Sequence, residues 1–288
     1  MQSASSQEEV EGYLRQSSEF LQLEVFSAGK KNKNVRWPLS QIFVDINHKI
    51  GYCPIGKVGN STLKEMFIGF SNIDNKEMIL SGGVHEVPDL YNTGLQLSDY
   101  PDDVVDGMIS DPEFVFFAVL RNPVERCLSV YWEKFVKNRR THGNVGHTAP
   151  VLSAVQRVPL NEVDVERGIS FKDFVNYVIS CNPDVLDTHW KPQERYLGGI
   201  VYNKLFALEN LDEMYRFLEE RTGLVINRKK TNSSRAGYAS VVEGAYNVLP
   251  GDLEKYDNIE KRCFLNSDLL RKIERYYSVD CLLHKFAA

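Results

Sequence analysis

Long apolar runs are missing from this sequence of 288 residues. It contains no stretch of about 18 or more apolar residues, the length that a helix needs to cross a bilayer. The N-terminal segment MQSASSQEEVEGYLRQSSEF holds no apolar core of the kind found in signal peptides. These two absences predict a chain without a membrane span and a cytoplasmic location.

The sequence also lacks an excess of basic residues and a pattern of metal-binding cysteines. Its 34 Lys and Arg stand against 39 Asp and Glu, which gives a formal net charge of −5. This balance argues against the broad basic field of a nucleic-acid-binding protein, so an anion site must be built locally. The five cysteines form no CxxC or Cys/His pattern, and we therefore expect reduced thiols and no metal site.

Strands that alternate with helices predict an α/β fold with a parallel sheet. Residues 42–46 and 49–55 are expected to be strands on either side of a polar turn, and the apolar spacing within 63–70 predicts a helix. The apolar run 114–120 is typical of a strand that is buried on both faces of a parallel sheet. Residues 139–168, with their Gly, His, Pro, Asn and Thr, are interpreted as a long surface loop.

A short loop before the predicted helix at 63–70 has the composition of an anion site. Backbone N–H groups at a helix N-terminus attract anions, and Gly59 permits a close backbone approach. Ser61 and Thr62 add hydroxyl donors, and Lys57 adds a positive charge. The loop is not a Walker A motif, in which Gly-Lys ends the loop and Ser or Thr follows. From the loop alone, a glycine turn with a surface lysine is an equally good interpretation.

Arg121 follows the apolar strand at 114–120, at the edge where open α/β sheets bind ligands. Ser129 would lie about two turns along the next helix, so the guanidinium and the hydroxyl could hold one phosphate. Taken alone, this segment is explained better by an ion pair of Arg121 with a carboxylate and by packing of a small residue at 129.

Together the two motifs resemble the cofactor-binding signatures of sulfotransferases that use 3′-phosphoadenosine 5′-phosphosulfate. Within that family the sequence resembles the carbohydrate sulfotransferases that include the chondroitin 4-O- and HNK-1 enzymes, over roughly residues 40–280. The segments that carry this resemblance include Phe43-Val44-Asp45, Arg121-Asn122-Pro123 and His189-Trp190. The animal members are Golgi proteins with an N-terminal anchor, so removal of an anchor would place this chain in the Golgi lumen. Gly56-Lys57 stands where the group usually has Pro-Lys.

The resemblance implies roles for individual residues. Residues 57–62 would bind the 5′-phosphosulfate, and the Arg121 segment would bind the 3′-phosphate. A basic segment at 221–235 occupies the position of a family loop that closes over the nucleotide, although charge alone indicates a solvated face. The implied cofactor-binding set is Lys57, Val58, Gly59, Asn60, Ser61, Thr62, Arg121, Ser129, Asn232, Ser234 and Arg235.

Two histidines are candidates for catalysis beside Lys57. His85 lies between the two cofactor motifs, where related enzymes carry their catalytic histidine, and His189 belongs to a further family segment. Without the resemblance, either would be interpreted as a surface or capping histidine. An imidazole titrates near neutral pH and suits a general base. We expect His85 to be the base and His189 to be a second catalytic candidate that could instead build the acceptor pocket.

The sequence therefore predicts a sulfotransferase that moves a sulfuryl group in line to an acceptor hydroxyl, without a metal. The expected fold is α/β, with a P-loop-like parallel sheet flanked by helices. It forms a single domain with helical additions over residues 39–288, after an N-terminal arm and helix at 1–38. The partners are a glycan or small-molecule acceptor and no nucleic acid, and the oligomeric state stays open. One rival is a P-loop nucleotide kinase, which needs a complete Walker A motif. The other is a non-catalytic nucleotide- or glycan-binding protein, which needs no acid–base pair.

Overall fold

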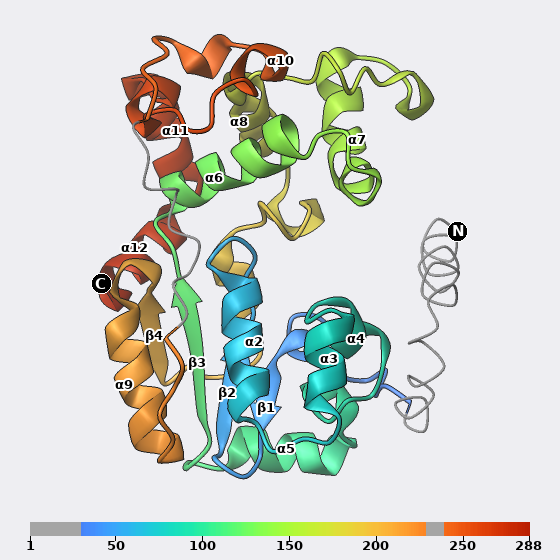
Figure 1. Ribbon diagram of the computed structural model, residues 1–288, viewed down its shortest axis with the longest axis vertical. Coiled ribbons are helices and arrows are strands. Elements are labelled where there is room, and N and C mark those ends of the chain that lie inside the picture. Colours follow the sequence, from blue (N-terminus) through green and yellow to red (C-terminus); the bar gives the residue numbers. More distant parts are fainter. Residues whose placement is uncertain (1–29, 229–238) are drawn as a thin grey trace. The chain divides into compact units, whose positions relative to one another are not determined.

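The computed structural model describes residues 30–228 and 239–288, which form two compact units (Figure 1). Among the described residues, unit 1 comprises residues 30–52 and 64–115, and unit 2 comprises residues 53–63, 116–228 and 239–288. The predicted boundary between an arm at 1–38 and a domain at 39–288 stays a prediction, because residues 1–29 lie outside the described part of the chain.

An antiparallel hairpin begins unit 1. Strand β1 (Phe43–Asp45) pairs with β2 (Ile50–Cys53), as the two predicted strands around a polar turn require. The register is Phe43 opposite Tyr52, Val44 opposite Gly51 and Asp45 opposite Ile50. The Asp45 carboxylate accepts a hydrogen bond from the backbone N–H of Asn47 at 3.0 Å, so a strand residue also fixes the turn.

Short helices make up the rest of unit 1. The α-helices are α2 (Asn60–Phe70), α3 (Lys76–Gly82), α4 (Glu86–Leu90) and α5 (Asp102–Ser110), and the 3-10 turns are Leu39–Gln41 and Leu97–Asp99. The apolar face that predicted α2 is confirmed, because Phe67 and Phe70 are buried with their ring centroids 4.9 Å apart. Phe67 also meets Phe43 of β1 edge to face at 6.0 Å, so this helix packs on the hairpin.

A parallel pair of strands begins the main part of unit 2. Strand β3 (Val115–Leu120) is the apolar run that the sequence marks as buried, and it pairs with β4 (Lys204–Ala207). The register is Phe117 opposite Lys204, Ala118 opposite Leu205, Val119 opposite Phe206 and Leu120 opposite Ala207. The strands follow the order β1-β2-β3-β4 in one sheet. The predicted α/β class is confirmed, with an antiparallel hairpin added to the parallel pair.

Helices surround a large aromatic core in unit 2. The α-helices are α6 (Pro123–Tyr131), α7 (His142–Gln156), α8 (Phe171–Ser180), α9 (Leu211–Thr222), α10 (Pro250–Leu253), α11 (Ser267–Tyr276) and α12 (Ser278–Ala287). A π-helical segment, Trp132–Lys137, follows α6. The 3-10 turns are Leu160–Glu162, Pro183–Val185, Gln193–Leu197, Leu208–Asn210, Ala245–Asn247 and Lys261–Phe264. Tyr131, Phe135 and Phe174 are fully buried in the core. Within residues 30–228 and 239–288, no helix combines the length and the apolar character needed to cross a membrane.

The interpretation of residues 139–168 as a surface loop is wrong, because 15 of them form α7. Gly143, Gly146 and Pro150 disfavour a helix locally. Tertiary contacts outweigh that preference: Val151 and Leu152 are buried on the helix. The composition of this segment is typical of a loop, whereas packing against the rest of unit 2 stabilises α7.

Candidate functional site

The candidate site lies in unit 2, where the chain turns from β2 into α2. Lys57 and Gly59 both have left-handed backbone conformations, with φ of 71° and 78°. Glycine adopts such a conformation without steric cost, but a lysine there is uncommon and strained. Strained residues of this kind gather at functional sites. The helical hydrogen bonds of α2 start at the Gly59 carbonyl, which accepts from the Leu63 N–H at 3.1 Å, so the helix begins directly after the loop.

The Lys57 side chain is mostly enclosed, with 18% of its surface exposed. Its ammonium forms an ion pair with the carboxylate of Glu133. Burial lowers the pKa of Lys57 to about 8, and the charges of Arg121, Lys134 and Arg126 add to this shift. Crowded like charges of this kind indicate a site that favours a negatively charged ligand.

Arg121 joins the two sequence motifs. Its Nη1 donates a hydrogen bond to the Lys57 carbonyl oxygen at 3.2 Å, and its Nη2 lies 3.8 Å from the Glu125 carboxylate. Its Nε is buried and has no hydrogen-bond partner among the described residues. A buried donor without a partner costs free energy, so this guanidinium has a capacity that an added acceptor would use.

The end of β3 that carries Arg121 is held by side chains from elsewhere in unit 2. The Arg121 N–H donates to Oε1 of Gln193 at 3.0 Å, and Nε2 of Gln193 donates to the Arg121 carbonyl at 2.9 Å. Gln193 is fully buried, and its own N–H donates to the Asp280 carboxylate at 2.8 Å. This anchoring fixes the backbone from which the guanidinium extends.

A second arginine, Arg126 on α6, fixes the start of the loop. It is buried, with only 3% of its surface exposed. Its Nε donates to the Gly56 carbonyl at 2.9 Å and its Nη1 to the Lys191 carbonyl at 2.9 Å. Arg126 therefore ties the turn that precedes Lys57 to the segment that follows His189.

His189 and His147 share the carboxylate of Asp187. Nδ1 of His189 lies 2.7 Å from Oδ1 of Asp187, and Nδ1 of His147 lies 2.7 Å from Oδ2. The two imidazole rings meet edge to face, with centroids 4.6 Å apart. The donor atoms of the three side chains lie within 4.8 Å of one another, and the two hydrogen bonds account for this spacing.

The charges in this cluster suit an acid–base role. Burial would raise the pKa of Asp187, but hydrogen bonds from His147 and His189 outweigh burial and hold the pKa well below its usual range. Burial lowers the pKa of His189, and the interaction with Asp187 opposes the shift. At neutral pH a charged Asp187 therefore orients a neutral His189, as an imidazole base requires.

The π-helical segment supplies two oppositely charged neighbours, Glu133 and Lys134. Segments of this kind occur frequently at functional sites. Glu133 meets Lys57, and its other carboxylate oxygen lies 3.8 Å from Nζ of Lys134. Lys134 is buried, and its charge contributes to the lowered pKa of His189. Within unit 2, the charge of Lys134 therefore acts on both Lys57 and His189.

The other predicted cofactor residues fall on the loop and on two helices. Val58 is buried in the loop, Asn60 and Thr62 are half-buried at the start of α2, and Ser61 is exposed there. Ser129 is half-buried on α6. All five belong to unit 2, and the Arg121–Lys57 hydrogen bond brings their two segments together.

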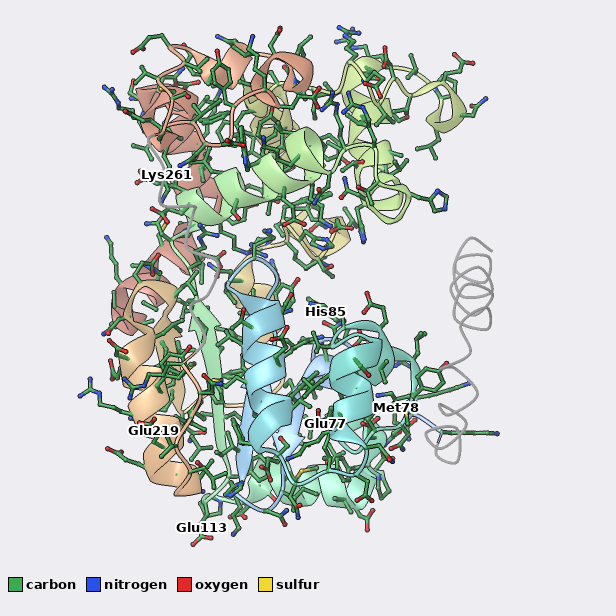
Figure 2. All side chains as sticks on the ribbon, in the orientation of Figure 1. Glu77, Met78, His85, Glu113, Glu219 and Lys261 are labelled. Atoms are coloured by element: carbon green, nitrogen blue, oxygen red, sulfur yellow. The ribbon has the colours of Figure 1, made fainter. Side chains whose placement is uncertain are left out.

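His85 belongs to unit 1, where Figure 2 labels it. It is half-buried and directly precedes α4, and its carbonyl accepts a hydrogen bond from the Asp89 N–H at 3.4 Å. The predicted contacts Asn232, Ser234 and Arg235 lie outside the described residues.

Sequence reasoning missed four residues that complete this site: Arg126, Glu133, His147 and Asp187. Asp187 had a usable signal, because an Asp two positions before a His can bond to it locally. The other three had none, because their partners are between 40 and 76 residues away in the sequence.

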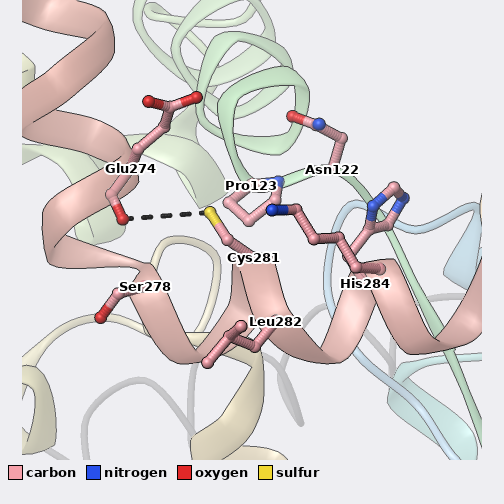
Figure 3. A pocket seen from close by; sticks show the side chains of 8 residues that line it. Asn122, Pro123, Glu274, Ser278, Cys281, Leu282 and His284 are labelled. Atoms are coloured by element: carbon pink, nitrogen blue, oxygen red, sulfur yellow. Dashed lines mark hydrogen bonds between the residues drawn. The ribbon is translucent and has the colours of Figure 1, made fainter.

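A separate open pocket lies beside the residues that follow Arg121 (Figure 3). Asn122 and Pro123 form one side, and residues of α11 and α12 form the other. Cys281 lies in it with its sulfur 3.9 Å from the Glu274 carbonyl, a long and weak contact. No predicted site residue lines this pocket.

Comparisons with known proteins agree on one family. A model described as the sulfotransferase family matches residues 40–287. Carbohydrate sulfotransferase 10 of Homo sapiens is 35% identical over 254 residues, which cover 84% of this chain and 65% of that protein. Carbohydrate sulfotransferase 10 of Gallus gallus is 28% identical over 254 residues, with 84% and 64% covered. The chain thus spans slightly less than two thirds of the length of these relatives. No solved structure matches.

Proposed function

Because this chain belongs to the sulfotransferase family, we propose that it transfers the sulfuryl group of 3′-phosphoadenosine 5′-phosphosulfate to a hydroxyl group of a carbohydrate. The observation that carries this proposal is the hydrogen bond from Arg121 to the Lys57 carbonyl. This bond connects the loop at Lys57, which suits one anion, to the end of β3 at Arg121, which suits a second anion. A nucleotide with a 5′ anion and a 3′-phosphate presents two such groups to one site.

The residues around the loop fit this donor. The unpartnered Nε of Arg121 is a buried donor that a phosphate oxygen would satisfy, and Ser129 would add a hydroxyl from α6. The N-terminus of α2, with Asn60, Ser61 and Thr62, would hold the 5′ end. Asn232, Ser234 and Arg235 remain proposed contacts from the segment outside the described residues.

Lys57 would act on the charge that develops during transfer. The bound donor supplies an activated sulfuryl group, and the bridging oxygen gains negative charge as that group leaves. Lys57 would stabilise this oxygen from a mostly enclosed position, where a charge acts more strongly than in water. The cations at the loop supply the charge that magnesium supplies in phosphoryl transfer, so we expect donor binding to be independent of Mg²⁺.

The general base is a histidine in this proposal. The position of His85 between the two cofactor segments makes it the first candidate, and His189 would then shape the acceptor pocket. A specific observation favours His189 as the second candidate, because Asp187 orients it and burial keeps it neutral. Either residue would take the proton of the acceptor hydroxyl during in-line transfer, without a covalent enzyme intermediate.

Calorimetry of the full chain with adenosine 3′,5′-bisphosphate, with and without a chelator, tests the donor site. We expect binding that the chelator does not change. A second assay measures transfer from labelled 3′-phosphoadenosine 5′-phosphosulfate to a panel of carbohydrate acceptors. Tight binding of ATP with magnesium, and none of the bisphosphate, would overturn the proposal in favour of a kinase. Donor binding without transfer to any carbohydrate tested would contradict the proposed acceptor class.

A further inference from the structure

A carboxylate contacts Lys57, the residue that would face the terminal group of the proposed donor. Glu133 pairs with the Lys57 ammonium, and both side chains are partly enclosed, with 36% and 18% of their surfaces exposed. An anion that reaches Lys57 must therefore bind beside a negative charge or displace it. This contact serves no obvious purpose in a site that only attracts anions.

We propose that Glu133 tunes the charge selectivity of the Lys57 site, because it weakens the binding of a more highly charged phosphoryl end more than it weakens the binding of a singly charged sulfuryl end. This inference rests on the proposed function, in which the 5′ end of the donor reaches Lys57. Glu133 would be a specificity-determining residue, and the group against which it discriminates is the terminal phosphoryl of a nucleotide that is otherwise identical.

Without Glu133 the site would favour the phosphoryl end more strongly. The charges of Arg121, Arg126 and Lys134 all act on Lys57, and such a group of cations attracts the most negative ligand available. A terminal phosphoryl group carries about −1.5 to −2 at neutral pH, whereas a sulfuryl end carries about −1. Repulsion from one carboxylate is proportional to the charge of the ligand, so Glu133 disfavours a phosphoryl end more than a sulfuryl end.

The size of the effect follows from the exposure of Glu133. The extra negative charge of a phosphoryl end would lie roughly 5 Å from the carboxylate, in surroundings between bulk water and protein interior. Coulomb repulsion over about 5 Å in such surroundings lowers the affinity for the phosphoryl nucleotide, relative to the sulfuryl nucleotide, by roughly fivefold to tenfold compared with a site that lacks this carboxylate. Arg121 and Arg126 donate hydrogen bonds to carbonyl oxygens of the loop. Glu133, in contrast, contacts the Lys57 ammonium directly, so we assign the effect on the ligand's charge to Glu133.

The test compares two nucleotides on the full chain by calorimetry. The first is 3′-phosphoadenosine 5′-phosphosulfate, and the second is 3′-phosphoadenosine 5′-diphosphate, in which a phosphoryl group replaces the sulfuryl group. We expect Glu133→Gln to change the ratio of the two Kd values in favour of the diphosphate by roughly fivefold to tenfold relative to the wild type. This change should come mainly from tighter binding of the diphosphate. Glu133→Asp, which keeps the charge, should retain the wild-type ratio.

Glu166→Gln is the matched control, because Glu166 is an exposed carboxylate of the same unit that pairs with Arg140. It should behave like the wild type, which separates a local effect from a change in net charge. A Glu133→Gln protein that binds donor but keeps the wild-type preference would overturn the inference alone. A wild-type chain that binds neither nucleotide would overturn the proposed function and this inference with it.

Discussion

Replacement of Arg121 by alanine should nearly abolish donor binding and leave the stability of the fold almost unchanged. The guanidinium donates one hydrogen bond to the loop, at the Lys57 carbonyl. Its Nε is a second, buried donor that has no hydrogen-bond partner among the described residues. When a phosphate is bound, loss of the guanidinium should reduce the binding free energy by about 2–4 kcal/mol, which corresponds to a roughly 30- to 700-fold higher Kd. Without ligand, the lost hydrogen bond is worth about 1 kcal/mol, and removal of the unpartnered Nε offsets it.

Two measurements separate these effects. Calorimetry with adenosine 3′,5′-bisphosphate should show the large loss of affinity, and thermal unfolding without ligand should show a small change in Tm. Arg140→Ala is the control, because Arg140 is an exposed arginine of the same unit that pairs with Glu166 and Glu254. It removes an arginine charge whose ion-pair partners are Glu166 and Glu254, and the variant should bind the bisphosphate like the wild type. An Arg121→Ala chain whose affinity stays within threefold of the wild type would refute the reasoning.

Further substitutions at Lys57, His85, His189 and Asp187 probe the chemistry. Lys57→Ala should lower turnover more than donor affinity, because the charge acts on the leaving oxygen, and an equal loss in both would contradict that role. Since the pKa of Lys57 is about 8, wild-type donor affinity should fall as the pH rises through that value, and Lys57→Arg, which stays charged, should remove this fall in a calorimetric pH series. His85→Ala should keep donor binding and lose turnover by about 10²–10⁴-fold, together with the ionisation near neutral pH, whereas His189→Ala should raise the acceptor KM more than it lowers kcat. A near-normal His85→Ala enzyme beside an inactive, donor-binding His189→Ala enzyme would reverse the assignment in a pH–rate comparison. Asp187→Asn should destabilise the fold at pH 7 by about 1–3 kcal/mol, because it loses bonds from two histidines to a charged carboxylate. The pKa of Asp187 is lowered in the folded chain, so its contribution is present above about pH 4 and is lost as the pH falls further. Urea unfolding at pH 7 and pH 3 should therefore show a gap between wild type and variant that narrows at pH 3, and a constant gap would contradict the ionic role.

The parts of the site that the sequence predicted depend on local patterns. The apolar run at 114–120 and the spacing within 63–70 mark β3 and α2, because burial alone explains such patterns. Lys57 and Gly59 mark the loop between strand and helix. These elements place Arg121 at the end of a buried strand and Lys57 before a helix. The family resemblance implies that the Lys57 loop and the Arg121 segment lie next to each other. In the structure they are connected by the hydrogen bond from Arg121 to the Lys57 carbonyl.

The parts that the sequence did not predict depend on contacts between distant segments. His147 was assigned to a loop, because Gly143, Gly146 and Pro150 disfavour a helix. Burial of one face of α7 outweighs that preference and brings His147 to Asp187 across 40 residues of sequence. Local composition contains no information on such a partner. Arg126 is a similar case, since an arginine inside a predicted helix is usually solvated, and here it is 3% exposed.

Glu133 shows why a charge at a functional site can be misread from sequence. The order Glu133-Lys134 on a predicted helix is typical of a solvated surface, where opposite charges alternate. In the structure Glu133 is partly enclosed and pairs with Lys57, and its neighbour Lys134 is buried. A lysine that must hold an anion gains nothing in affinity from a carboxylate partner. The pairing is therefore explained better by selection among anions than by attraction of anions, and that explanation stands or falls with the comparison of sulfuryl and phosphoryl nucleotides.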